Sequence, residues 1–154
     1  MSVRSIPSQE WSRVARRSIE ERVADRDDRT MLAAFQRHGG LMSCESMTDA
    51  LRCRDAQPLS TLARWIVSRS IVTLQAPGRM LVPLFQFTPR DWALRASVVR
   101  VLDELRDTFD DREMALWFAT PNVWLDSRAP LACVGEGDHE LCQAARADRF
   151  VARG

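Results

Sequence analysis

The sequence predicts a mainly helical protein, in which a small helix-turn-helix or winged-helix-like unit with one β-hairpin precedes a compact helical domain. Apolar residues recur at three- and four-residue spacing along most of the chain, and this period is lost only between about residues 71 and 87. Gly and Pro mark the ends of the expected helices. We divide the chain into an N-terminal amphipathic helix (1–29), a helix-turn-helix-like unit with a hairpin wing (30–87) and a helical domain (88–154).

The first segment, residues 8–28, has the pattern of an amphipathic helix with Ser8 as its N-cap. Its apolar residues share one face, and they are Trp11, Val14, Ala15, Ile19 and Val23. The opposite face is dense with Arg and Glu. We interpret that face first as solvated and second as a contact with an oligomer or an acidic partner. The charged cluster from Asp25 to Arg29 interrupts the stripe and predicts a hinge.

Three short helices are expected next. The first spans Met31 to His38 and ends at a Gly-Gly pair. Ser43 caps the second, roughly 44–54, and the third runs from Pro58, at its first turn, to about residue 69. The expected inward residues are Met47, Ala50, Leu51, Leu62, Ala63 and Ile66.

A β-hairpin follows this helical group. Residues 71–74 are apolar and β-branched, 80–87 form a second strand-like run, and Ala76-Pro77-Gly78 is a turn signal between them. Pro83 indicates an edge position or a bulge in the second strand.

Four helices are expected in the last part. Thr88, Pro89 and Asp91 give a strong start to a helix that reaches about residue 108. Asp110 with Glu113 starts another helix, which Thr120-Pro121-Asn122 breaks. Two more helices follow, a short one over 130–134 and a last one capped by Asp138; the tail 150–154 is expected to be loose.

No motif in the sequence indicates an enzyme. The chain has no G-x-S-x-G, P-loop or dinucleotide-binding fingerprint, and its two His residues, His38 and His139, belong to no recognisable metal or catalytic arrangement. The spacing of the four Cys residues matches no zinc or redox motif, so we expect them to fill the core in a reducing compartment. We therefore expect a cytoplasmic protein with no catalytic residue, no cofactor, no metal and no membrane segment.

Charge and topology together suggest DNA binding. All 22 basic residues are Arg, and residues 1–79 carry a net charge of +4 against −3 for residues 80–154. A helix-turn-helix can place its third helix in the major groove and its wing tip near phosphate. The expected DNA-facing residues are Ser60, Thr61, Arg64, Ser68, Arg69 and Arg79. The alternative is a structural three-helix module whose Arg residues only solvate it.

The second half carries a recognisable pattern. The stretch Trp117-Phe118-Ala119-Thr120-Pro121-Asn122, followed by Leu125 and then Ala129-Pro130-Leu131, resembles the toxin-binding domain of Xre/MbcA/ParS-type antitoxins. The resemblance covers about residues 30–150, because upstream segments such as Leu62 to Ile66 resemble the helical part often joined to that domain. The chain departs from the pattern at Asp126-Ser127, where the family often has Gly, and at Ala132-Cys133, where it often has a polar residue.

The resemblance implies a RES-domain toxin that consumes NAD as the partner, neutralised through the C-terminal region, with operator DNA bound for autoregulation. We also expect a homo-oligomer. It implies that partner-binding residues are Trp117, Pro121, Asn122, Val123, Trp124, Arg128, Arg146, Arg149 and Arg153. Arg149 and Arg153 are candidates to enter an NAD pocket of the toxin. Read from the residues alone, Trp117, Pro121 and Leu125 build a helical core, and both roles can hold.

Two other functions fit the same sequence. One is a stand-alone winged-helix transcription regulator whose C-terminal domain dimerises. The other is a structural or adaptor protein with no role on DNA.

Overall fold

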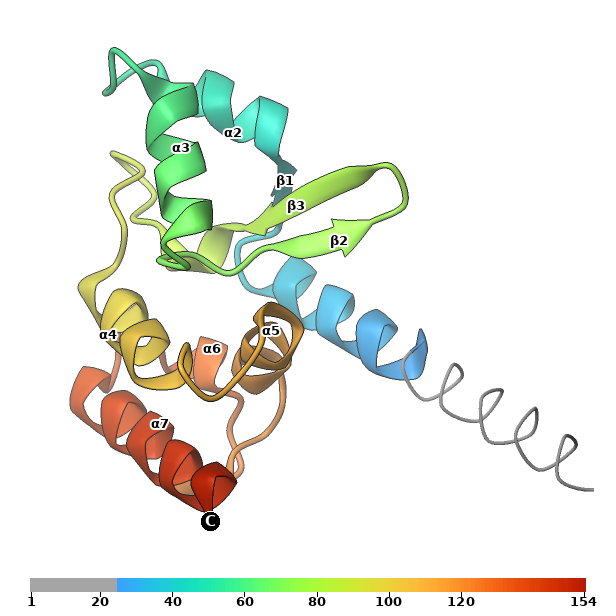
Figure 1. The fold of residues 1–154 in the computed structure, drawn as a ribbon, viewed down its shortest axis with the longest axis vertical. Coiled ribbons are helices and arrows are strands. Elements are labelled where there is room, and N and C mark those ends of the chain that lie inside the picture. The colour runs from blue at the N-terminus through green and yellow to red at the C-terminus, as the bar shows by residue number, and fades with distance from the viewer. Residues whose placement is uncertain (1–24) are drawn as a thin grey trace, which may run out of the picture.

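The computed structural model describes residues 25–154 and confirms a mainly helical fold with a small antiparallel sheet (Figure 1). The helix predicted over 8–28 therefore lies almost wholly outside the described residues. The hinge predicted at Asp25–Arg29 is wrong, because these residues belong to a helix that continues to residue 37. Among the described residues, no helix combines the length and the apolar character needed to cross a bilayer.

The N-terminal half follows the element order of a winged helix: a helix, a strand, two helices and a hairpin (Figure 1). These elements are residues 25–37, β1 (Leu41–Ser43), α2 (Cys44–Leu51), α3 (Pro58–Val67), β2 (Leu74–Ala76) and β3 (Arg79–Pro83). We call residues 25–87 the winged unit.

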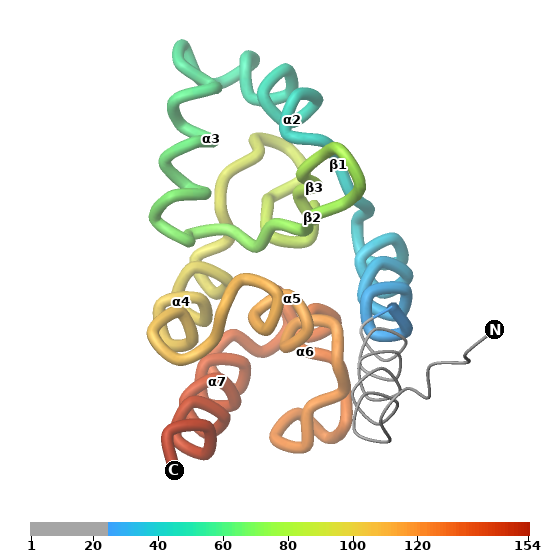
Figure 2. Tube along the Cα trace, turned by 45° about the vertical axis from the view of Figure 1, so that its right-hand side comes forward, coloured from blue at the N-terminus to red at the C-terminus, as the bar shows by residue number. Residues whose placement is uncertain are grey.

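The C-terminal half is a group of helices below α2, α3 and the sheet in both views (Figures 1 and 2). Its elements are α4 (Ala96–Leu105), α5 (Asp111–Ala119), the 3-10 turn η2 (Val123–Leu125), α6 (Pro130–Cys133) and α7 (Asp138–Arg153), whereas the 3-10 turn η1 (Leu84–Gln86) lies at the end of the winged unit. Helices α4 and α7 pack along each other over much of their length.

The sheet has three strands in the order β1-β3-β2, all antiparallel. Leu81 of β3 lies opposite Ser43 of β1 on one side and opposite Leu74 of β2 on the other. The hairpin is confirmed, although its first strand begins three residues later than predicted. Strand β1 was not predicted, because three residues are too few to show a period.

Two predicted helix ends in the winged unit are confirmed, whereas the helix predicted over about 44–54 already ends at Leu51. Ser43 caps α2, its Oγ accepting a hydrogen bond from Ser46 N at 3.1 Å. Gly39 and Gly40 end the first helix with φ of +98° and +90°. Residues other than glycine rarely adopt such φ values. In the C-terminal half, Asp110 and Glu113 form the predicted reciprocal cap of α5, with both hydrogen bonds at 2.8 Å.

The helix start predicted at Thr88 is wrong, since residues 88–95 form a turn and α4 begins at Ala96. The side chain of Thr88 donates to Asp91, and the Thr88 amide donates to Ala93 O at 2.9 Å. Trp92 has φ +54°, which a right-handed helix excludes. Polar residues that can cap a helix thus close a local turn instead.

The C-terminal tail also differs from the prediction. Helix α7 continues to Arg153, and its N-cap is Gly137, with Asp138 in the first turn. Arg153 Nε donates to Thr108 Oγ1 at 3.0 Å, which secures the end of the helix against the end of α4. The tail is therefore ordered because it has a partner element to pack on.

The main core joins the two halves. Phe35 from the first helix stacks on Phe85 with ring centroids 5.5 Å apart, and Phe85 contacts Phe118 of α5 at 5.0 Å. A second, smaller cluster lies within the winged unit and consists of Met47, Leu51, Leu62, Ile71, Val82 and Phe87. The boundary predicted at residue 87 therefore does not coincide with a gap between cores.

Candidate partner-binding site

The loop 122–128 between α5 and α6 has an unusual backbone. Asn122 N donates to Arg128 O at 3.0 Å, and Ser127 N donates to Asn122 O at 3.0 Å, so the loop closes on itself. Asp126 and Ser127 are both left-handed, with φ of +54° and +60°. Each such residue costs about 1–2 kcal/mol relative to a right-handed one, so the surroundings must hold it.

One carboxylate joins the start of the loop to α7. Asp148 on α7 accepts hydrogen bonds from Trp117 Nε1 at 2.7 Å, from Asn122 Nδ2 at 2.6 Å and from Trp124 Nε1 at 2.9 Å. The three donors come from α5, from the start of the loop and from η2. Hydrogen bonds to an ionised acceptor are about twice as strong as neutral ones, so this Asp148 network fixes the loop on the helix.

The sequence reasoning missed Asp148. A signal for it was available: Leu141, Ala145 and Asp148 fall at helical spacing, so an acid follows two buried residues on the packed face of α7. A carboxylate on such a face needs donors, and two Trp residues and an Asn upstream could supply them.

The loop exposes large apolar side chains above this network. Val123 is 80% exposed and Trp124 54%, and Val151, one turn beyond Asp148 on α7, is 65% exposed. The last turns of α7 lie beside the loop in both views (Figures 1 and 2). We call Val123, Trp124 and Val151 the docking patch.

The remaining partner-binding residues of the sequence prediction lie either in and around the loop or on α7. Trp117 and Asn122 lie under the docking patch and belong to the Asp148 network, while Pro121 is exposed at the entry to the loop. Arg128 lies at the loop exit, where its guanidinium donates to Glu136 at 2.7 Å and to Ala132 O at 3.2 Å. The hydrogen bond to Glu136 raises the pKa of Arg128.

The three Arg residues of α7 lie away from the docking patch, along α4. Arg146 Nε donates to Glu104 at 2.7 Å, and Arg149 donates to the same carboxylate. The hydrogen bond with Glu104 raises the pKa of Arg146. Arg153 contacts Thr108. These contacts join α7 to α4, so the structure favours a structural role for Arg149 and Arg153 over insertion into an NAD pocket.

The predicted DNA-facing residues are only partly available for contact. Ser60, Arg64 and Ser68 are exposed on α3, and Arg79 is exposed at the wing. Thr61 is 9% exposed, and its hydroxyl accepts from Arg64 Nη2 at 3.4 Å. Thr61 is therefore too buried to reach a phosphate or a base edge.

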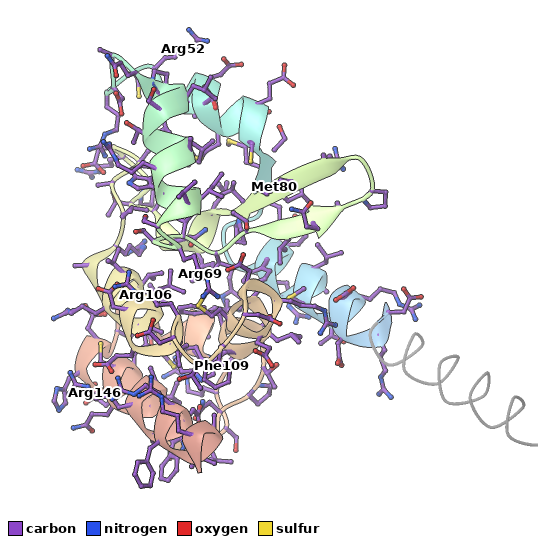
Figure 3. All side chains as sticks on the ribbon, in the orientation of Figure 1. Arg52, Arg69, Met80, Arg106, Phe109 and Arg146 are labelled. Atoms are coloured by element: carbon purple, nitrogen blue, oxygen red, sulfur yellow. The ribbon has the colours of Figure 1, made fainter. Side chains whose placement is uncertain are left out.

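Arg69 has a different role from the one predicted (Figure 3). Its guanidinium donates to Asp111 Oδ1 at 2.7 Å, to Arg106 O at 2.5 Å and to Phe109 O at 2.7 Å. It thereby satisfies carbonyls after α4 that have no partner within the helix. Arg69 joins the winged unit to the C-terminal helices, so its guanidinium is occupied within the protein and does not face DNA.

The exposed face of α3 is apolar rather than basic. Leu59 is 69% exposed and Val67 84%, and Ala63, predicted to be inward, is exposed between them. The adjoining groove between α2 and α3 has a volume of about 440 Å³, and Glu45 and Asp49 lie among its lining residues. The cations of this surface are Arg64 and Arg52, and Arg52 is paired with Asp49 at 3.1 Å. The surface therefore resembles a protein contact more than a phosphate contact.

A second, polar cavity of about 500 Å³ lies between α4 and α7 and includes His139, Cys142 and Gln143. His139 is hydrogen-bonded to Gln143 at 2.8 Å, and burial raises the pKa of the Cys142 thiol. A thiol with a raised pKa is a poor nucleophile. Within residues 25–154 no group of three His, Cys, Asp or Glu residues is placed to hold a metal ion.

Comparison of the chain with family models, with curated proteins and with solved structures finds no match.

Proposed function

We propose that this chain is an antitoxin-like protein that binds a RES-type, NAD-consuming toxin through the docking patch and neutralises it. The observation that carries this proposal is the Asp148 network beneath Val123 and Trp124. Hydrogen bonds and two left-handed residues hold the shape of a loop whose apolar side chains face solvent. Such an arrangement is characteristic of a binding site, in which strain persists because function requires the shape.

The chemistry of the docking patch fits a protein partner. A Trp whose ring is held by a hydrogen bond at one edge presents a large apolar surface at low entropic cost. The RES-type partner itself rests on the sequence resemblance described above. We propose a binding protein without catalytic activity or cofactor of its own. We place it in the cytoplasm, where its four unpaired Cys residues would stay reduced.

Co-expression with a RES-domain toxin of the same host tests the proposal. The wild-type chain should restore growth and co-purify with the toxin. Val123→Asp places a charge in the docking patch at an 80% exposed position, so it should abolish both effects without altering the helical content. Val67→Asp, the same change at an 84% exposed position on α3, is the matched control and should neutralise like the wild type.

Two outcomes would contradict this function. Neutralisation by Val123→Asp at the wild-type level would remove the docking patch as the binding site. Failure of the wild-type chain to bind any RES-domain protein of its host would remove the antitoxin role. A truncation after Ala145 is a poorer test, because it deletes Asp148 and disturbs the fold as well as the surface.

DNA binding is the second candidate, as an operator contact of the antitoxin or as the activity of a stand-alone winged-helix regulator. The element order of the winged unit favours it. Ser60, Arg64, Ser68 and Arg79 are then the contacts. A shift of the chain's own promoter DNA should weaken in Arg64→Ala and in Arg79→Ala, with a shallower salt dependence in each. An unchanged shift in both would exclude this surface.

A further inference from the structure

The exposed face of α3 carries an apolar ridge. Leu59, Ala63 and Val67 follow each other at intervals of four residues, so they form one row along the helix. The two large members are 69% and 84% exposed, and the small one lies between them. No residue within 25–154 covers this row, although each member could have been polar at no cost to the core.

The two sides of the ridge differ in charge. On one side lies the α2–α3 groove, whose charged lining residues are Glu45, Asp49 and Arg52. Arg52 pairs with Asp49 at 3.1 Å, so Glu45 gives this side its net negative charge. On the other side lies Arg64, about 100° around the helix from Ala63. The ridge is therefore an apolar strip with an acidic border and a basic border.

We propose that this ridge is the contact surface for a second copy of the same chain. The two copies are related by a two-fold axis that lies between their ridges and runs roughly parallel to α3. The pattern is self-complementary under that operation. Ala63 meets its own copy and permits close approach of the two helices, while Leu59 and Val67 pack against their counterparts on either side of it. The contact is closed, because each copy uses the same patch and leaves no second surface free.

Charge determines the orientation of the pair. When the two α3 helices run in the same direction about such an axis, the acidic border of each copy faces the basic border of the other. Arg64 then lies across from Glu45 of the second copy, whereas Asp49 is already paired with Arg52 of its own chain. An antiparallel pair would bring acidic border against acidic border, so the parallel arrangement is favoured.

DNA would need the same face, and the observations favour the second copy. Phosphate is attracted by clustered cations, whereas this face presents three apolar residues and an acidic border. An apolar row that stayed bare would also be an aggregation hazard. The proposal is independent of the docking patch, which lies on η2 and α7.

Sedimentation velocity of the full chain over a range of concentrations tests the pairing. The wild type should sediment as a monomer–dimer mixture, and Val67→Asp should weaken the dimer at least about tenfold. Val123→Asp, which alters only the docking patch, should associate like the wild type. The two proposals can therefore fail independently, because Val123→Asp tests toxin binding and Val67→Asp tests dimerisation.

Charge exchange provides the sharper measurement. Arg64→Glu and Glu45→Arg should each weaken the dimer, and the double variant should recover most of the wild-type association, because each copy again meets the opposite charge. A wild type that is monomeric at its highest soluble concentration would overturn the proposal, as would a Val67→Asp variant that dimerises normally. Reduced promoter DNA binding by Val67→Asp at unchanged molecular mass would assign the face to DNA instead.

Discussion

The two exposed apolar surfaces of this molecule are supported in different ways. On α3, Leu59 and Val67 project from a regular helix whose other side packs on the second core cluster. In the loop, Val123 and Trp124 project from a backbone with two left-handed residues, held by the carboxylate of Asp148. The helix surface therefore depends on many small contacts, whereas the loop surface depends on a few hydrogen bonds, three of which share the carboxylate of Asp148. Substitutions that affect one support and not the other can test this difference.

The largest effect is expected for Asp148→Ala. The substitution leaves Trp117 Nε1, Asn122 Nδ2 and Trp124 Nε1 without their acceptor. Unsatisfied donors that are partly buried cost about 1–3 kcal/mol each, and water replaces some of the loss, so we expect about 3 kcal/mol of destabilisation. In a chain of this size that corresponds to a fall in Tm of about 6–12 °C, measurable by calorimetry.

Asp103→Ala is the matched control for this prediction, because it is also an Asp→Ala change in a helix. Asp103 forms an exposed pair with Arg106, three residues along α4, which should contribute less than about 0.5 kcal/mol. Equal destabilisation by the two variants would show that the loop does not depend on Asp148. The difference between the two surfaces would then disappear.

A smaller effect is expected at the joint between the two regions. Arg69→Ala removes the contacts to Asp111, Arg106 O and Phe109 O, and we expect a loss of about 2 kcal/mol, reduced by partial solvent exposure. Arg69 also has φ +54°, a conformation that glycine adopts freely. Arg69→Gly loses the same contacts without the backbone strain, so it should be about 1 kcal/mol less destabilised than Arg69→Ala.

Urea unfolding of the two Arg69 variants measures this order. Arg69→Ala as stable as the wild type would mean that the guanidinium contributes nothing to the joint. Arg69→Gly less stable than Arg69→Ala would mean that the positive φ is not a feature of the folded state at this residue.

Much of the fold follows from local sequence, and the confirmed elements show why. Ser43, Asp110 and the Gly39-Gly40 pair fix helix ends through groups within a few residues, so their roles can be inferred from spacing alone. The same reasoning failed at Thr88, where identical residue types close a turn. Local polar residues indicate where one element ends, but they do not determine whether a helix or a turn follows.

The candidate site was harder to predict, because its support is non-local. The loop and its Trp residues were identified from the sequence, but Trp117 and Asp148 are 31 residues apart and Arg69 and Asp111 are 42 apart. Periodicity gives the face on which a side chain lies and not the element it meets. For the same reason, Arg146 and Arg149 were expected at a partner, whereas both contact Glu104 of α4.

The smallest effect concerns carboxylates that close surface turns rather than support a loop. Hydrogen bonds from the Thr88 hydroxyl and the Ala93 amide lower the pKa of Asp91, and this stabilisation is present above the pKa of the unfolded chain, about 3.9. It is lost as the pH falls through the lower pKa of the folded chain. The stability difference between the wild type and Asp91→Asn should therefore be constant from neutral pH to about pH 5 and shrink below about pH 4.

Urea midpoints of both proteins between pH 7 and pH 3 give that difference directly. Asp55, whose pKa is lowered by hydrogen bonds from Thr61 and the Gln57 amide, should behave in the same way at the start of α3. A difference that persists unchanged at pH 3 would mean that the turn does not hold Asp91 in its charged form.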